Sequence, residues 1–178
     1  MELKSILMNK EAVERTLMRM AHEIIENNQG TDKLCLVGIK TRGIPLAKRL
    51  ADNIAKITGV NIPVGTLDIN LYRDDLEKQS IDPVLSSTDI PFSIKGQNVV
   101  LVDDVIYTGR TVRAAMDALF ALGRADKIRL MVLIDRGHRE LPVRPDFVGK
   151  NIPTSHGEMI AVTLSETDGS TGVSLFKI

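Results

Sequence analysis

The chain has few aromatic residues. Phe, Tyr and Trp together make up 3% of its 178 residues, and Trp is absent. Aromatic rings are the platforms on which sugars and single-stranded bases stack, so this composition argues against a site of that kind. A phosphate site needs backbone amides and cations instead, and the scarcity of rings leaves it open.

Cysteine is nearly absent too. The single Cys35 cannot form an internal disulfide, which is typical of a reducing cytoplasm. It lies in the apolar run 34–39, where a small buried hydrophobe is favoured over a catalytic thiol. No leader-like segment opens the sequence, and no apolar run reaches the length of a membrane span. We therefore expect a cytoplasmic protein without a membrane partner.

Charge of one sign is not in excess, because 23 Lys and Arg balance 23 Asp and Glu. The total does not indicate a nucleic-acid binder, but a zero total can hide a basic face opposite an acidic one. The length and the hydrophobic content of 43% indicate a single domain over residues 1–178 with a core of its own.

Hydrophobic periodicity predicts strands that alternate with helices. Asn9 is the expected N-cap of the first helix, Gly30 its end, and Phe120 is expected inside the third helix. Such alternation is typical of an α/β fold with a mainly parallel sheet, whose ligands bind beyond the carboxyl ends of the strands. Helices are expected at 10–28, 44–57 and 109–122, strands at 34–39, 62–71, 99–102 and 128–134, and short strands and turns over 147–178.

Residues 73–93 are polar and contain two prolines. A structureless stretch of this length inside a compact domain is uncommon and often functional. A flexible lid and an irregular surface loop are equally consistent with the sequence.

The segment 99–111 carries the strongest chemical signal. Its apolar strand leads into Asp103 and Asp104, and a short loop with Thr108 and Gly109 then opens a helix. Backbone N–H groups at a helix start bind anions, and glycine lets a phosphate approach closely. Two carboxylates suit ribose hydroxyls or a hydrated Mg²⁺. A sugar phosphate would satisfy both halves of this segment.

Two further loops follow predicted strands. Residues 38–43 hold two cations between two glycines, a composition suited to the charge that develops on a leaving pyrophosphate. Residues 133–142 end a strand at Asp135 and continue with Arg136. For this third loop, ordinary turn chemistry is nearly as good an interpretation as a ligand contact.

The string 99–111 resembles the 5-phosphoribosyl-1-pyrophosphate (PRPP) signature of the type I phosphoribosyltransferases. The resemblance implies their fold, which has a mainly parallel central sheet flanked by helices, a small hood and a flexible lid loop. It also implies Mg²⁺ as cofactor, bound at Asp103 and Asp104 either directly or through water. Catalytic roles fall to Asp103, Asp104 and the lid residue Arg73. The implied PRPP and nucleotide contacts are Lys40, Thr41, Arg42, Gly43, Asp103, Asp104, Val105, Ile106, Tyr107, Thr108, Gly109, Arg110, Thr111, Arg136 and Val162.

Further segments are similar to one group within that family, the bacterial pyrimidine-operon attenuators that also act as uracil phosphoribosyltransferases. This resemblance implies that uracil and PRPP give UMP, that the UMP-bound protein binds leader mRNA of the pyrimidine operon, and that the chain forms a homodimer or higher homo-oligomer. A purine-salvage phosphoribosyltransferase without RNA binding is the alternative. The segments are 21–25, 37–43, 71–76, 110–117, 135–142 and 146–154; one departure is His156, where many relatives have a basic residue.

Local charge partly supports RNA binding. On the first predicted helix, Arg15, Arg19 and His22 share one face at i, i+4 and i+7, opposite the apolar stripe. A second basic segment follows residue 136. Together they could form one phosphate-binding surface, although without the resemblance a solvated helix face and turn would be the preferred interpretation. The candidate RNA contacts are Arg15, Arg19, His22, Arg139, Arg144 and Lys150.

Overall fold

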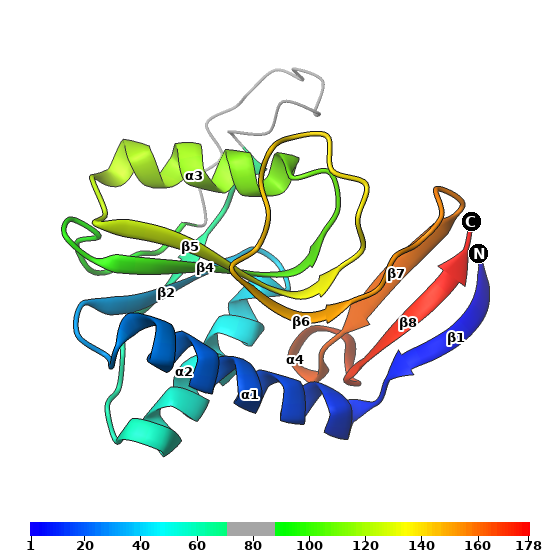
Figure 1. The fold of residues 1–178 in the computed structure, drawn as a ribbon, viewed down its shortest axis with the longest axis horizontal. Coiled ribbons are helices and arrows are strands. Elements are labelled where there is room, and N and C mark those ends of the chain that lie inside the picture. The colour runs from blue at the N-terminus through cyan, green and yellow to red at the C-terminus, as the bar shows by residue number, and fades with distance from the viewer. Residues whose placement is uncertain (71–87) are drawn as a thin grey trace.

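The computed structural model describes residues 1–70 and 88–178. Its centre is a parallel sheet of five strands in the order β3-β2-β4-β5-β6 (Figure 1). Because all neighbours are parallel, the loops that follow β2, β4 and β5 emerge at the same edge of the sheet. The strands are β2 (Leu34–Ile39), β3 (Val64–Leu67), β4 (Asn98–Ile106), β5 (Lys127–Asp135) and β6 (Phe147–Asn151).

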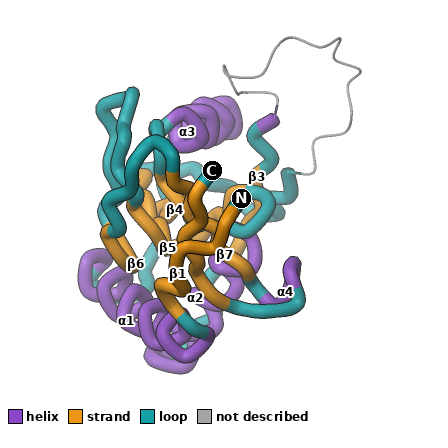
Figure 2. Tube along the Cα trace, turned by 90° about the vertical axis from the view of Figure 1, so that its right-hand side faces the viewer, coloured by secondary structure: helices purple, strands orange, loops and turns teal. Residues whose placement is uncertain are grey.

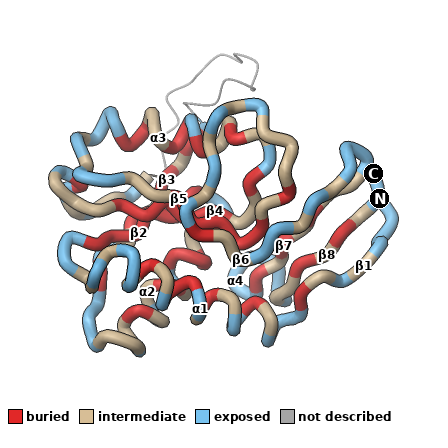
Figure 3. Tube along the Cα trace, in the orientation of Figure 1, coloured by how far each residue is buried: buried red, intermediate tan, exposed pale blue. Residues whose placement is uncertain are grey.

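Helices cover both faces of this sheet. α1 (Lys10–Asn28) and α2 (Gly43–Thr58) lie on one face and α3 (Arg110–Leu122) on the other, as Figures 1 and 2 both show. Successive strand residues alternate between two cores, as the period of two requires. Val100 and Val102 pack with α1 and α2, whereas Leu101 packs with α3. Buried residues accordingly follow the central strands and the inward faces of the helices in Figure 3.

A second, antiparallel sheet stands beside the first. It has the order β1-β8-β7 and is built from β1 (Glu2–Met8), β7 (Glu158–Thr163) and β8 (Gly172–Lys177). The short helix α4 (Ser165–Asp168) joins β7 to β8. We call residues 158–177 together with β1 the hood. Figure 1 shows the hood at one end of the main sheet, with both chain termini on it.

The predicted elements are largely confirmed, with four corrections. The strand expected at 99–102 continues through Ile106, so the two acids lie within it, and the strand expected at 62–71 is limited to Val64–Leu67. The first helix ends on Gln29, a left-handed residue, rather than on Gly30. Phe120 is 63% exposed instead of inside. β1 has no counterpart in the prediction.

Cys35 is a buried hydrophobe, as expected. It is fully buried in the core on the α3 side of the sheet, and burial raises the pKa of its thiol to about 12. A thiol protonated at every physiological pH is a poor nucleophile. Among the described residues, no helix is both long and apolar enough to cross a membrane.

Candidate functional site

The two acids of β4 differ in their surroundings. Asp103 is only 7% exposed, and burial, reinforced by the neighbouring Asp104, raises its pKa well above the ordinary value. The carboxylate of Asp103 accepts a bond from the amide of Asp104, and that of Asp104 accepts one from the amide of Val105. Asp104 is half-buried. Because β4 is the central strand, the rigid core holds both carboxylates near the edge where ligands bind.

The loop after β4 leads directly into α3. Gly109 is the N-cap of α3 and has φ +95°, a conformation that side chains rarely adopt. A Cβ atom there would also lie 2.5 Å from Cγ2 of Val143. The N-cap glycine has no side chain to cap this helix, and the first turn contains no acid. The amide of Arg110 donates to the hydroxyl of Thr108 at 3.4 Å. No carboxylate therefore neutralises the positive end of the helix, which favours an anion, as the sequence predicts for Thr108–Thr111.

The loop after β2 packs against β4. A Cβ atom on Gly43 would meet the carbonyl oxygen of Val102 at 2.3 Å, and one on Gly38 would meet the carbonyl oxygen of Gly43 at 2.5 Å. Only glycine permits this approach, which places residues 40–43 beside Asp103 and Asp104. The peptide bond between Lys40 and Thr41 is cis. The predicted pyrophosphate loop and the predicted sugar loop are thus neighbours.

Both cations of this loop have acidic partners. The ammonium of Lys40 lies 3.6 Å from a carboxylate oxygen of Asp68, and Lys40 has further partners. Nε and Nη2 of Arg42 donate to the two oxygens of Asp168 at 3.2 and 2.9 Å. Sequence reasoning missed Asp168, since 126 residues separate it from Arg42 and nothing local marks the pair.

Arg136, expected as a base-side or phosphate-side contact, is held by the chain itself. It is 8% exposed and donates to Oγ1 of Thr154 at 3.1 Å and to the carbonyl of Glu158 at 2.8 Å. Its guanidinium lies 4.0 Å above the ring centre of Tyr107. These contacts connect the end of β5 to the hood and to Tyr107 in the loop after β4. A ligand contact by Arg136 remains a prediction, and the contacts that Arg136 makes in the structure do not favour it.

Arg139 is engaged in a similar way. It donates to the carbonyls of Tyr107 and Val143 and to the carboxylate of Asp135. Arg144 lines the same surface pocket as Arg139, together with Asn151 of β6. These two candidate RNA contacts therefore belong to the loop that lies over Gly109 rather than to the face of α1.

The α1 residues lie exposed on one side of the helix, as predicted. Arg19 donates to the carbonyl of Gly149 in β6 at 2.6 Å and also pairs with Glu23. The strand residue after Gly149 is Lys150, which is exposed. The structure thus brings the basic face of α1 next to β6. Arg19 already uses some of its N–H donors in hydrogen bonds to Gly149 and Glu23.

Two site residues remain. Arg73 lies outside the described residues, as does most of the expected lid at 73–93. Val162 is a buried residue of β7 whose side chain belongs to the core on the α1 and α2 side. Only its backbone could meet a ligand.

A sequence model of the phosphoribosyl transferase domain family matches residues 4–166. Bifunctional protein PyrR of Pelotomaculum thermopropionicum is 58% identical over 98% of this chain and 96% of its own length. Bifunctional protein PyrR of Clostridium beijerinckii is 56% identical over 99% of each chain. The chain belongs to the PyrR family of phosphoribosyl transferase domains.

The PyrR assignment agrees with the fold of solved phosphoribosyltransferases. A hypoxanthine phosphoribosyltransferase of Trypanosoma cruzi superposes with a TM-score of 0.77 at 18% identity, over 98% of this chain and 96% of that one. The enzyme of Staphylococcus aureus gives 0.73 at 19% identity, over 97% and 92%. At such low identity, the similarity shows that this chain has the type I phosphoribosyltransferase fold.

Proposed function

We propose that this protein converts uracil and PRPP to UMP and pyrophosphate, and that its UMP-bound form binds the leader mRNA of a pyrimidine operon as a transcriptional attenuator. The observation that carries the enzymatic half is the meeting of three elements at one sheet edge: the acids of β4, the uncapped start of α3 and the loop 40–43. The PyrR relatives at 53–58% identity support both halves.

Each element has a distinct task in the transfer. The amides of residues 108–111 hold the 5′-phosphate, and Asp103 and Asp104 accept bonds from the ribose hydroxyls. Lys40 and Arg42 stabilise the pyrophosphate as it leaves. A uracil nitrogen attacks the anomeric carbon while the bond to pyrophosphate breaks, and the proton of that nitrogen passes to water or to the departing pyrophosphate. The two carboxylates stabilise positive charge that develops on the ribose.

Mg²⁺ fits such a site through few protein ligands. Within residues 1–70 and 88–178, no group of three or more His, Cys, Asp or Glu converges as a closed cage would require. Magnesium commonly uses one or two carboxylates together with substrate phosphates, and Asp103 and Asp104 are the carboxylates that would hold it. Bound with PRPP, the ion neutralises charge on the pyrophosphate.

The RNA half rests on the exposed face of α1 and its neighbour β6. Arg15 and Lys150 are exposed cations on these adjacent elements, and such cations bind phosphates. Bases of an RNA loop would supply the specificity. A homodimer would present this surface twice.

The transferase is tested by assaying PRPP and Mg²⁺ with a panel of nucleobases. We expect UMP from uracil and no nucleotide from hypoxanthine or guanine. Turnover of the purines alone would instead assign the chain to purine salvage. Absence of any product, with PRPP binding also absent by calorimetry, would overturn the enzymatic half.

The regulator is tested by filter binding on pyrimidine-operon leader RNA, with UMP present and absent. UMP should tighten binding, because the nucleotide site and the RNA surface act in one chain. An unrelated RNA of equal length serves as control. Affinity that does not change with UMP, or that is equal for both RNAs, would contradict the proposal.

A further inference from the structure

Arg42 connects the candidate site to the hood. Its side-on pair with Asp168 uses Nε and Nη2, so Asp168 leaves Nη1 to other partners. A guanidinium has five N–H donors in a fixed plane, and it can serve a carboxylate on one side and a phosphate oxygen on another. The bond to Asp168 raises the pKa of Arg42, and the charge of Asp104 acts in the same direction. Arg42 therefore interacts electrostatically with Asp104 of β4 and with Asp168 of the hood.

Asp168 is itself fixed before it meets Arg42. Its Oδ2 atom accepts bonds from the amide of Leu164 at 2.9 Å and from the hydroxyl of Thr167 at 2.7 Å. Leu164 is fully buried in the core that α1, α2 and the hood share. The carboxylate thus has a position set by the core, and Arg42 is ordered through it. Ordering a long side chain in advance removes an entropy cost that ligand binding would otherwise carry.

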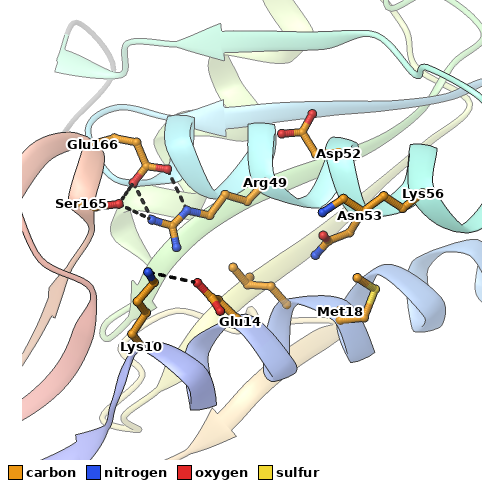
Figure 4. A pocket seen from close by; sticks show the side chains of 10 residues that line it. Lys10, Glu14, Met18, Arg49, Asp52, Asn53, Lys56, Ser165 and Glu166 are labelled. Atoms are coloured by element: carbon orange, nitrogen blue, oxygen red, sulfur yellow. Dashed lines mark hydrogen bonds and ion pairs between the residues drawn. The ribbon is translucent and has the colours of Figure 1, made fainter.

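Arg49 of α2 provides an internal contrast to Arg42, which is the N-cap of that helix. Arg49 lies seven residues after Arg42, two turns along the same helix, and donates to Glu166, Ser165 and Thr171. Figure 4 shows Arg49 with Glu166 and Ser165 at one end of a groove between α1 and α2. The groove has a volume of about 570 Å³. Arg49 attaches the hood to the middle of α2, whereas Arg42 attaches it to the pyrophosphate loop.

We propose that Asp168 is a positioning residue for pyrophosphate: it holds Arg42 so that the remaining donors of the guanidinium face the pyrophosphate group of PRPP. This inference rests on the proposed transferase function. It makes the hood part of the anion site, although no hood side chain needs to touch the ligand. Asp168 acts through Arg42 alone, so its effect should disappear when Arg42 is removed.

The test is Asp168→Asn, assayed for uracil transfer beside the wild-type protein. Asparagine keeps an oxygen for the amide of Leu164 but loses the charge that orients Arg42. We expect the KM for PRPP and the inhibition constant of pyrophosphate each to rise roughly tenfold, as for the loss of one charge-assisted pair. The value of kcat should stay within about twofold and the KM for uracil should not change. Glu166→Gln, which disrupts the pair with Arg49, is the matched control and should leave the KM for PRPP unchanged.

A second readout separates positioning from general support of the fold. In an Arg42→Ala background, Asp168→Asn should change the KM for PRPP by less than about twofold. An equal further loss there, or an equal effect of Glu166→Gln, would overturn the inference. Tighter pyrophosphate binding by Asp168→Asn would also overturn it, because Asp168 would then compete with the ligand. If Asp168→Asn does not fold, Arg42→Lys, which keeps the charge but not the side-on geometry, should raise the KM for PRPP similarly.

Failure of this inference differs from failure of the proposed function. If the wild-type protein binds Mg²⁺ and PRPP and Asp168→Asn binds them equally well, only the role of Asp168 falls. If calorimetry finds no PRPP binding to the wild-type protein, the transferase proposal falls and the inference falls with it.

Discussion

Two helices of this protein begin in opposite ways. At the start of α1, Asn9 has an extended backbone and its side chain accepts a bond from the amide of Ala12, while Glu11 adds negative charge to the first turn. At the start of α3, left-handed Gly109 offers no side chain, and the first turn carries no acid. The chain neutralises the positive end of α1 itself and leaves that of α3 to a ligand.

The position of each helix in the fold explains the difference. α1 follows the hood strand β1, away from the ends of the parallel strands, whereas α3 follows β4, where the sheet gathers its ligand groups. α2, which follows β2 at the same edge, likewise has no side-chain cap and no acid in its first turn. An uncapped helix start at this edge is therefore a functional feature, and a capped one elsewhere is a structural feature.

The largest effect should come from Gly109→Ala. Alanine at φ +95° is strained, and its Cβ atom would lie against Val143, so the loop must move away from the phosphate. We expect PRPP affinity to fall at least about thirtyfold, with a stability loss of about 1–2 kcal/mol. Calorimetry and thermal unfolding measure the two. Gly59→Ala is the control, since Gly59 has φ +75° at the end of α2 with open space around it. The Gly59→Ala variant should be less stable than the wild type but should bind PRPP equally well. If both variants lose PRPP affinity to the same extent, the start of α3 has no special role in binding.

A change on the exposed face of α1 should affect the binding of RNA rather than of PRPP. Arg15→Glu reverses a charge on the proposed RNA surface without touching the start of the helix. Leader RNA affinity should fall at least about tenfold in the presence of UMP, and the salt dependence of binding should become shallower. Lys95→Glu is the control. It reverses an exposed charge just before β4, at the edge of the sheet where the strands begin, and should leave RNA affinity unchanged. Loss of transferase activity in Arg15→Glu would mean that the change disturbs the fold.

Removing the cap of α1 should have a purely structural effect. Asn9→Ala deletes the bond to the amide of Ala12 and should lower the free energy of unfolding by about 1 kcal/mol. The Asn9→Ser variant retains a capping group and should recover most of that loss. Urea unfolding gives the stability, and PRPP binding should match that of the wild type. A change in PRPP affinity would show that the two helix starts are not independent.

The smallest effect is expected from the pair of Arg49 and Glu166, and it should depend on pH. The hydrogen bond from Arg49 lowers the pKa of Glu166 from its ordinary value of 4.5 to about 2. A depressed folded-state pKa gives stability that is complete above the unfolded value and disappears as the pH falls towards the folded value. Glu166→Gln should therefore be slightly less stable than the wild type at pH 7, by less than about 1 kcal/mol for a partly exposed pair. The difference should shrink between about pH 4.5 and 2 in unfolding curves; a constant difference would mean that charge is not its cause.

The sequence predicts the parts of this fold that local chemistry determines. The strand at 34–39 is a continuous apolar run, as buried parallel strands are, and its bounds are confirmed. Asn9 as the cap of α1 follows from a rule that acts within a few residues. The loop 99–111 is recognisable because its strand, acids and glycine are contiguous.

The missed features depend on partners far along the chain. β1 is an edge strand whose exposed side chains show no regular alternation, and its partner β8 begins at residue 172. The pair of Arg42 and Asp168 was missed for the same reason, because its partners lie far apart along the chain. An aromatic residue at helical spacing, such as Phe120, is expected to be buried. The stripe of α3 that faces the sheet is narrower, however, and leaves this ring in solvent.

The pairing of β1 with β8 has a consequence for biosynthesis. Glu2 lies opposite Lys177, so this sheet can form only after two segments far apart along the chain have both been synthesised. The parallel core can form earlier, because its strands lie between residues 34 and 151. Contacts between distant residues also form slowly. A nascent chain would therefore acquire its central strands before the hood, and Arg42 would receive its carboxylate partner only once residue 168 has been made.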